Sequence, residues 1–186
     1  MPPKAKVTEK EIIAAAVEIV RVSGEGSLNA RALANKLGCS TQPIFSNFEN
    51  MEKVRQAVID YAQKLYDEYL QREIESGKYP AYKASGMGYI SFAREEKELF
   101  KLLFMRDRSF EPATLELTRD PVIEITQQST GYSYEKAERF HLEMWVMVHG
   151  IASMIATSFL DWDMEMASGV VSDMYFGLRA RFDSEV

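Results

Sequence analysis

Apolar residues recur at helical spacing from the beginning of the 186-residue chain to its end, and this period restricts the possible folds more than any other feature. Segments that alternate as strands do are scarce, whereas helix-start and helix-stop signals separate successive apolar stripes. The clearest start signal is Thr8 followed by Glu11, the spacing of a capping box, directly ahead of an apolar stripe. The pattern predicts an all-α protein of about nine helices.

Glycine and capping residues predict where these helices begin and end. Gly24 ends the first helix, and a second helix lies between its cap Asn29 and Gly38. Ser40 is the expected cap of a third short helix. Longer helices should follow over about 51–75, 81–95, 97–105, a stretch within 113–128, 134–160 and 163–182.

The net charge of −6 at first argues against a nucleic-acid-binding protein, but the charges are unevenly distributed. Residues 1–55 carry a balance of +2, and the remainder carries −8. We call residues 1–55 the head. A mildly basic head followed by an acidic remainder is compatible with a protein that contacts phosphate only through its head.

Few residues of the chain are suited to hold a metal ion or a disulfide. Cys39 is the one cysteine, and His141 and His149 are the two histidines, so we expect no disulfide framework, no metal site and no cofactor. No apolar segment follows the first lysines, so we expect no secretory signal and a cytoplasmic setting. The longest uncharged run, 144–160, contains a histidine and a glycine, and we interpret it as a buried helix rather than a membrane span.

The most informative block of sequence covers residues 27–54. Its pattern predicts a short helix, a tight turn and a second short helix, which is the arrangement of a helix-turn-helix that reads the major groove of DNA. Four apolar residues are spaced to form a small shared core: Leu33, Leu37, Ile44 and Phe48. Polar side chains suited to base edges and phosphates are then left to face outward: Thr41, Gln42, Ser46 and Asn47. The alternative is a helical hairpin that arises by chance in an unrelated bundle.

The same block resembles the tetracycline-repressor (TetR/AcrR) family of transcriptional regulators. The residues that carry the resemblance are Leu37-Gly38-Cys39-Ser40, Thr41-Gln42-Pro43-Ile44-Phe45-Ser46-Asn47-Phe48 and Glu49-Asn50-Met51-Glu52-Lys53-Val54. The match runs without a gap over about the first 55 residues, and the helix layout extends it to the whole chain. It implies a three-helix DNA-binding domain over 1–52 and a helical ligand-binding and dimerisation bundle over 53–186.

The resemblance also implies which residues contact DNA. They are Lys4, Lys6, Asn29, Ala30, Arg31, Ser40, Thr41, Gln42, Pro43, Phe45, Ser46, Asn47 and Lys53. Two positions depart from the family pattern, because Phe45 stands where the family has a tyrosine and Met51 where it has a lysine. Each change removes a phosphate contact, so we expect a shallower salt dependence of DNA binding than is usual for such repressors.

The C-terminal part shows no catalytic signature, so we expect no enzyme. It is instead rich in methionine and aromatic residues, which suit a pocket for a small hydrophobic effector but could equally form a plain core. The candidate ligand-binding residues are Met87, Tyr89, Phe92, Phe104, Met105, Trp145 and His149.

Two histidines of the predicted eighth helix receive different interpretations. The stretch Trp145–Gly150 resembles a W-x-x-x-H-G signature of one branch of the family, which implies that His149 is a polar anchor in the pocket. The alternative is a core histidine satisfied by a backbone carbonyl. His141 is expected near the surface, without a special role.

The resemblance further implies an isologous homodimer built from the last two helices. Its candidate interface residues are Gly150, Ser153, Met154, Gly169, Val170 and Gly177. Such a dimer presents two recognition helices to a palindromic operator, from which effector binding would release it. Two alternatives stay open: a helical small-molecule binding protein that has lost specific DNA binding, and an enzyme that uses His149 with Glu143.

Overall fold

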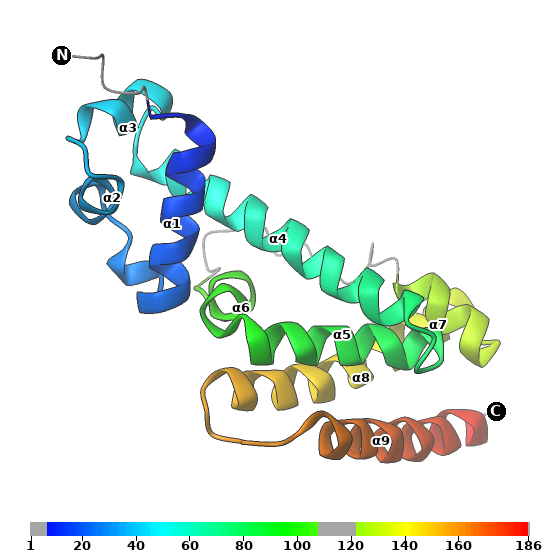
Figure 1. The fold of residues 1–186 in the computed structure, drawn as a ribbon. Helices are drawn as coiled ribbons and strands as arrows, with labels where there is room; N and C mark the ends of the chain where they lie inside the picture. Colours follow the sequence, from blue (N-terminus) through cyan, green and yellow to red (C-terminus); the bar gives the residue numbers. More distant parts are fainter. Residues whose placement is uncertain (1–6, 108–121, 186) are drawn as a thin grey trace. The chain divides into compact units, whose positions relative to one another are not determined.

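The computed structural model describes residues 7–107 and 122–185, and within them it confirms an all-α protein (Figure 1). The bounds of its helices are α1 Glu9–Ser23, the 3-10 turn η1 Glu25–Ser27, α2 Ala30–Leu37, α3 Gln42–Asn47, α4 Met51–Glu75, α5 Ala81–Glu95, α6 Lys97–Phe104, α7 Val122–Thr130, α8 Tyr134–Ala156 and α9 Met164–Ser184. Most of the predicted loop over 106–112 and most of the range predicted to hold a seventh helix lie outside the described residues.

The caps of the first helices test the start signals read from the sequence. Thr8 and Glu11 form the predicted capping box, and the Asn29 side chain accepts hydrogen bonds from two amides of α2. The predicted cap at Ser40 is wrong, because α3 begins at Gln42 and its N-cap Thr41 makes no side-chain capping bond. Pro43 lies in the first turn and has no amide hydrogen, so one of the usual partners of a cap is missing there.

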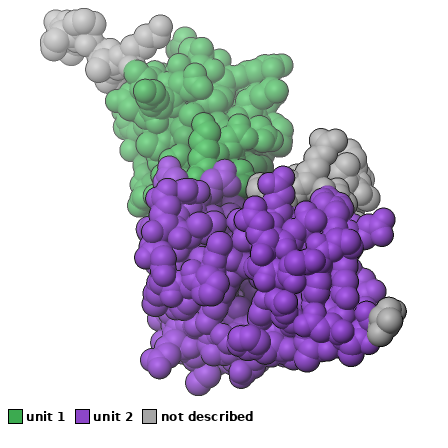
Figure 2. Space-filling model, turned by 90° about the vertical axis from the view of Figure 1, so that its right-hand side faces the viewer, with its two compact units in different colours: residues 1–65, 96–106 green, residues 66–95, 107–186 purple. Residues whose placement is uncertain are grey.

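The chain divides into two compact units, coloured green and purple in Figure 2. Unit 1 consists of residues 1–65 and 96–106, and unit 2 of residues 66–95 and 107–186. The division falls inside α4 and again between α5 and α6. Unit 1 therefore contains the predicted DNA-binding head together with the first part of α4 and the whole of α6.

Unit 1 is held together by an apolar core and by one well-formed ion pair. Ile12, Leu33 and Ile44 are fully buried on α1, α2 and α3. The guanidinium of Arg21 on α1 donates two hydrogen bonds, each 2.8 Å, to the carboxylate of Glu96 directly before α6. Such bidentate geometry is the strongest form of this pair, and it raises the pKa of Arg21 above its ordinary value.

Unit 2 is built around α5, which buries ten of its fifteen residues. It packs against α7, α8 and α9, and its Gly88 lies against the second half of α4. A Cβ atom at Gly88 would lie 3.1 Å from both the Cα of Leu70 and the carbonyl oxygen of Tyr69. Because both neighbours are backbone atoms, the two helices can approach this closely only with glycine at this position.

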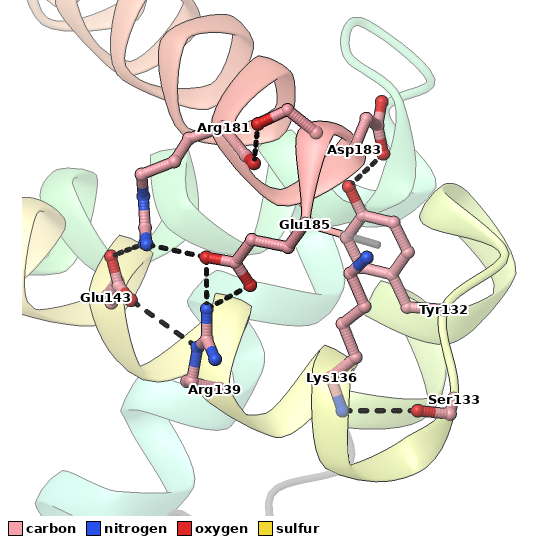
Figure 3. A network of polar contacts seen from close by, with 9 residues as sticks. Tyr132, Ser133, Lys136, Arg139, Glu143, Arg181, Asp183 and Glu185 are labelled. Atoms are coloured by element: carbon pink, nitrogen blue, oxygen red, sulfur yellow. Dashed lines mark hydrogen bonds and ion pairs between the residues drawn. The ribbon is translucent and has the colours of Figure 1, made fainter.

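The C-terminal end of α9 is fastened to α8 by a network of charged side chains (Figure 3). Arg139 and Arg181 both bind the carboxylates of Glu143 and Glu185. Both guanidinium groups also lie over the ring of the buried Phe182, at 4.5 and 4.6 Å from its centroid. Exposed ion pairs contribute little singly, but a network around a buried ring fixes where the last turn of α9 sits.

The uncharged run 144–160 lies mostly within α8. Ile151, Ala152 and Ile155 are buried there, whereas Val146 and Met147 are exposed, so the helix has one buried face rather than being buried all round. None of the helices in the described ranges has the length and apolar character needed to cross a membrane.

The close contact at Gly88 yields a test of the α4–α5 packing. We expect Gly88→Ala to be less stable than Gly86→Ala by about 1 kcal/mol or more, because only the Cβ at position 88 meets backbone. A Cβ at Gly86 would lie 3.5 Å from a methyl group of Val148, an ordinary contact, and alanine there gains about 1 kcal/mol of helix propensity. The measurement is urea unfolding of both variants, and equal midpoints would contradict the packing described here.

Candidate functional site

The first candidate site is the turn that joins α2 to α3 in unit 1. Gly38 has φ +64°, a left-handed conformation that glycine adopts without strain. Its amide and that of Cys39 bond back to carbonyl oxygens at the end of α2, the latter to Ala34 at 3.0 Å. This glycine-ended turn stops α2 and sends the chain directly into α3, as a helix-turn-helix requires.

The apolar residues of α2 and α3 turn inward and leave a polar outer surface on α3. Leu33 and Ile44 are fully buried, Phe48 is 8% exposed, and Leu37 is half-buried. The predicted DNA-contacting residues that are exposed are Asn29, Arg31, Ser40, Thr41, Gln42, Phe45, Ser46 and Lys53, and those that are half-buried are Ala30, Pro43 and Asn47. Lys4 and Lys6 lie outside the described residues.

Two polar side chains of α3 are engaged within the protein: the Ser46 hydroxyl donates to the carbonyl oxygen of Gln42 at 2.9 Å, and the amide of Asn47 makes two bonds. The Nδ2 of Asn47 donates to the carbonyl oxygen of Pro43 at 2.7 Å and to that of Val7 at 3.3 Å. The amide of Gln42 has no such role in the described contacts. The side chains that α3 offers outward are therefore headed by Thr41, Gln42, Phe45 and Ser46.

The outer surface of α3 carries no charge of its own. Phe45 is 46% exposed on it, and α3 contains no lysine, arginine, aspartate or glutamate. The exposed cations on adjacent elements are Lys10 in the first turn of α1, Arg31 in the first turn of α2, Lys36 in its last turn and Lys53 in the first turn of α4. Phosphate contacts would come from these flanks rather than from α3 itself.

The second candidate site is a cavity of about 360 Å³ in unit 2. Two helices contribute lining residues at positions i, i+3, i+4 and i+7, which is one face of each helix. These are Tyr82, Ser85, Gly86 and Tyr89 of α5, and His141, Met144, Trp145 and Val148 of α8. The rest of the lining is Tyr66, Leu70, Pro80, Lys83, Val122, Ser129, Val171, Ser172, Tyr175 and Phe176.

Polar atoms occur in this largely aromatic wall as bonded pairs. The Tyr82 hydroxyl and His141 Nδ1 share a hydrogen bond of 3.2 Å, and Lys83 Nζ donates to the Ser172 hydroxyl at 2.7 Å. The prediction that His141 lies near the surface is wrong, because its side chain is only 6% exposed. Its position three and seven residues before Met144 and Val148 places it on the face of α8 that lines the cavity.

The candidate ligand-binding residues named from the sequence occupy three different places. Tyr89 and Trp145 line the cavity, whereas Met87 and Phe92 are fully buried and are not among its lining residues. Phe104 and Met105 belong to unit 1. His149 is not among the lining residues, but it contacts Tyr89 and Trp145, which are.

His149 is contacted by three neighbouring side chains. Its Nδ1 shares a hydrogen bond of 2.8 Å with the Tyr89 hydroxyl, and its Nε2 one of 3.2 Å with the Ser153 hydroxyl. The Trp145 ring stacks on the imidazole with centroids 4.9 Å apart. Burial lowers the pKa of His149 below its ordinary value, so the neutral ring is favoured.

Several lining residues were not singled out from the sequence, notably Tyr82, Lys83, His141, Ser172 and Tyr175. A usable signal was present, since polar side chains interrupt the apolar stripes of α5 and α8 at helical spacing. Lys83 carried no such signal, because a lysine in a first helical turn is ordinarily solvated. Only the position of α9 brings Ser172 within reach of its ammonium group.

The candidate dimer residues lie on α8 and α9. Gly150, Ser153, Met154 and Val170 are half-buried, and Gly169 and Gly177 are exposed. The same two helices expose large apolar side chains, among them Val146 at 55%, Met166 at 55% and Phe176 at 67%. No group of histidine, cysteine, aspartate or glutamate side chains in the described residues could hold a metal ion.

Comparison with known proteins bears directly on unit 2. Residues 82–171 match the family model described as the tetracyclin repressor-like C-terminal domain. These residues form a TetR-type C-terminal domain. The matched range contains most of the cavity lining on α5, α7 and α8, so the TetR-family assignment rests on the unit that holds the cavity. TetR-family proteins are transcriptional regulators rather than enzymes.

Solved structures share the TetR fold along nearly the whole chain. A TetR-like transcriptional regulator from Rhodococcus sp. RHA1 aligns with a TM-score of 0.69 and 16% identity, over 96% of each chain. A protein of unknown function from the same organism aligns with a TM-score of 0.71 and 20% identity, over 97% of this chain and 98% of that one.

A third structure is a TetR variant from Acinetobacter baumannii AYE in complex with minocycline. It aligns with a TM-score of 0.58 and 16% identity, over 96% of this chain and 97% of that one. At such identities these likenesses establish the fold alone. A search of curated proteins found no match.

The half-buried His149, whose neutral form is favoured, predicts a pH-dependent contribution to stability. Because its pKa is lower in the folded protein than in the unfolded chain, the contribution is complete above the unfolded value of about 6.5 and is lost as pH falls below it. The non-titrating variant His149→Gln should therefore lose less stability than the wild type between pH 7.5 and pH 5. Thermal unfolding at several pH values checks this, and a constant difference between the two proteins would contradict it.

Proposed function

We propose that the protein is a homodimeric transcriptional repressor that leaves a palindromic operator when a small, largely apolar molecule fills the cavity of unit 2. The observation that carries the proposal is the outer surface of α3, where Thr41, Gln42 and Ser46 follow directly on the glycine turn at Gly38. The family match over residues 82–171 supports a transcriptional regulator, and we infer that it acts on DNA in the cytoplasm.

Recognition of bases falls to the neutral side chains of α3. The Gln42 amide can bond in a bidentate manner to adenine in the major groove, and the hydroxyls of Thr41 and Ser46 can bond to bases or phosphates. Arg31 and Lys53 flank α3 and would supply charge to the phosphate backbone. The proposal thus separates base contacts on α3 from phosphate contacts on α2 and α4.

A small molecule in the cavity would act on the head through chain continuity. Tyr66 and Leu70 of α4 line the cavity, and the residues of α4 up to Leu65 belong to unit 1. Likewise α5 lines the cavity and continues at Glu96, which is bonded to Arg21 on α1. An effector and DNA must then oppose each other by the same factor, because coupling between two sites is reciprocal.

Two further observations support an effector and a dimer. The cavity is large enough for a small organic molecule and has aromatic walls, and a TetR of the same fold has been solved with minocycline. The large apolar side chains exposed on α8 and α9 are suited to burial against a second copy. Two copies related by a two-fold axis would present two α3 helices to two half-sites.

The decisive experiment is fluorescence anisotropy of the purified protein with the intergenic DNA upstream of its own gene, in the presence of excess unrelated DNA. We expect competitor-resistant binding that Gln42→Ala weakens about tenfold, the worth of one good base contact. Gln128→Ala serves as the matched control, because Gln128 is an exposed glutamine on α7 in unit 2. Sequence-blind binding by the wild type would instead favour the alternative of a small-molecule binding protein that has lost specific DNA recognition.

The exposed phenylalanine on α3 generates a gain-of-function prediction. We expect Phe45→Tyr to tighten DNA binding about fivefold, because the new hydroxyl can donate a hydrogen bond to a phosphate.

The wild type should show a shallow dependence of affinity on salt concentration, since α3 carries no cation. A salt titration of both proteins checks this, and a steep slope for the wild type would contradict the expected small number of phosphate contacts.

A further inference from the structure

The cavity of unit 2 has a marked charge asymmetry. Of the described residues that line it, Lys83 is the one lysine or arginine, and none is an aspartate or glutamate. The remaining lining is aromatic, aliphatic or hydroxyl-bearing, apart from the Met144 thioether and the His141 imidazole. Among the described residues, the walls therefore offer a molecule one ammonium group and no carboxylate.

The contacts of Lys83 within the described residues are with neutral groups. Its ammonium donates to the Ser172 hydroxyl at 2.7 Å and lies 4.8 Å from the centroid of the Tyr79 ring. No ion pair of Lys83 occurs among these residues, and the first turn of α5 contains no acidic residue. An ammonium has three donors, so the contact with Ser172 leaves capacity for an acceptor supplied from outside.

The lining also has a solvent-facing part and a buried part. Lys83 on α5 and Ser172 on α9 are half-buried, and Phe176, four residues after Ser172, is 67% exposed. Tyr82, Tyr89, Met144 and Val148 are each less than 8% exposed and form the interior. A ligand that fits this arrangement has a charged group at one end and a flat apolar body at the other.

The amino-terminal end of α5 strengthens the preference for an anion. Pro80, Tyr82 and Lys83 at this end all line the cavity. The amino-terminal end of a helix carries partial positive charge, which adds to the charge of the Lys83 ammonium. Both features favour a negatively charged group at the same place, and the single lysine suits a single negative charge.

We propose that the cavity binds an aromatic carboxylate, with the carboxylate paired to Lys83 and the ring among the aromatic side chains of the interior. This proposal rests on the proposed function, in which the cavity is the effector site. It adds the chemical class of the effector and names Lys83 as the residue that selects it.

The experiment compares three probes that share one ring system and differ in charge. They are 2-naphthoate, neutral 2-naphthamide and cationic 2-naphthylmethylammonium, titrated into the purified full chain by isothermal calorimetry. We expect 2-naphthoate to bind at least about tenfold more tightly than the amide, the worth of one charge-assisted hydrogen bond. The cation should bind most weakly, because it meets the Lys83 ammonium without a neutralising carboxylate.

Variants then assign the selectivity to Lys83. Lys83→Met should weaken 2-naphthoate about tenfold and leave 2-naphthamide unchanged within about twofold, whereas Lys83→Arg should retain most of the preference. Lys78→Met is the matched control, because Lys78 stacks on the same Tyr79 ring but does not line the cavity. Unchanged binding of the amide by Lys83→Met also shows that this variant is folded.

Three results would overturn the proposal. They are equal binding of 2-naphthoate and 2-naphthamide, a preference for 2-naphthoate that survives Lys83→Met, and the absence of measurable binding by 2-naphthoate. Each of them leaves the proposed regulator intact, because DNA binding is measured without any probe. Loss of specific DNA binding in the anisotropy experiment, with 2-naphthoate binding retained, would instead reject the repressor and keep the ligand class.

Discussion

The structure of unit 2 depends on the burial of α5 on nearly all of its sides. Each face of a helix that is covered this way must pack against a different neighbour. On the face toward α4, the packing depends on Gly88, which lets the backbones of the two helices approach closely. On the face toward α8, a row of side chains, largely aromatic and polar, lines a cavity between the two helices.

Two hydroxyl–imidazole pairs join α5 to α8 along this row. Tyr82 pairs with His141 and Tyr89 with His149, so matching partners are seven residues apart on α5 and eight on α8. A buried polar group is costly without a partner, and each pair satisfies two groups at once. The first pair lines the cavity and the second is tied to it through Tyr89 and Trp145, so a ligand that moves these rings would also disturb the hydrogen bonds between the helices.

The two units share segments of chain, and this gives the proposed regulation a physical route. Residues on α4 and α5 line the cavity, and the same stretches of chain continue into unit 1. There, the bidentate pair between Arg21 and Glu96 fastens the segment after α5 to α1, one of the helices that support α3. A shift of α5 would therefore reach α1 through covalent bonds and one strong ion pair, without a new contact having to form.

Local signals in the sequence were sufficient for the elements of this protein. The capping box at Thr8, the turn glycine at Gly38 and the apolar stripes predicted the all-α fold and most helix bounds, because each depends on residues within one or two turns. The exposed surface of α3 could also be inferred, since the burial of Leu33 and Ile44 determines which of its neighbours face outward. The helix start expected at Ser40 failed, because a proline changed the capping requirements of α3.

The cavity, by contrast, was decided by tertiary structure. In the sequence, Tyr89 and Trp145 look like ordinary core residues, as Met87 and Phe92 do, and only the packing of α5 against α8 separates lining from core. The partners of His141, His149 and Lys83 lie between 4 and 89 residues away along the chain. Local periodicity determines which face of a helix is buried, but it does not determine which distant residue that face contacts. The chemistry of the cavity depends on those long-range contacts.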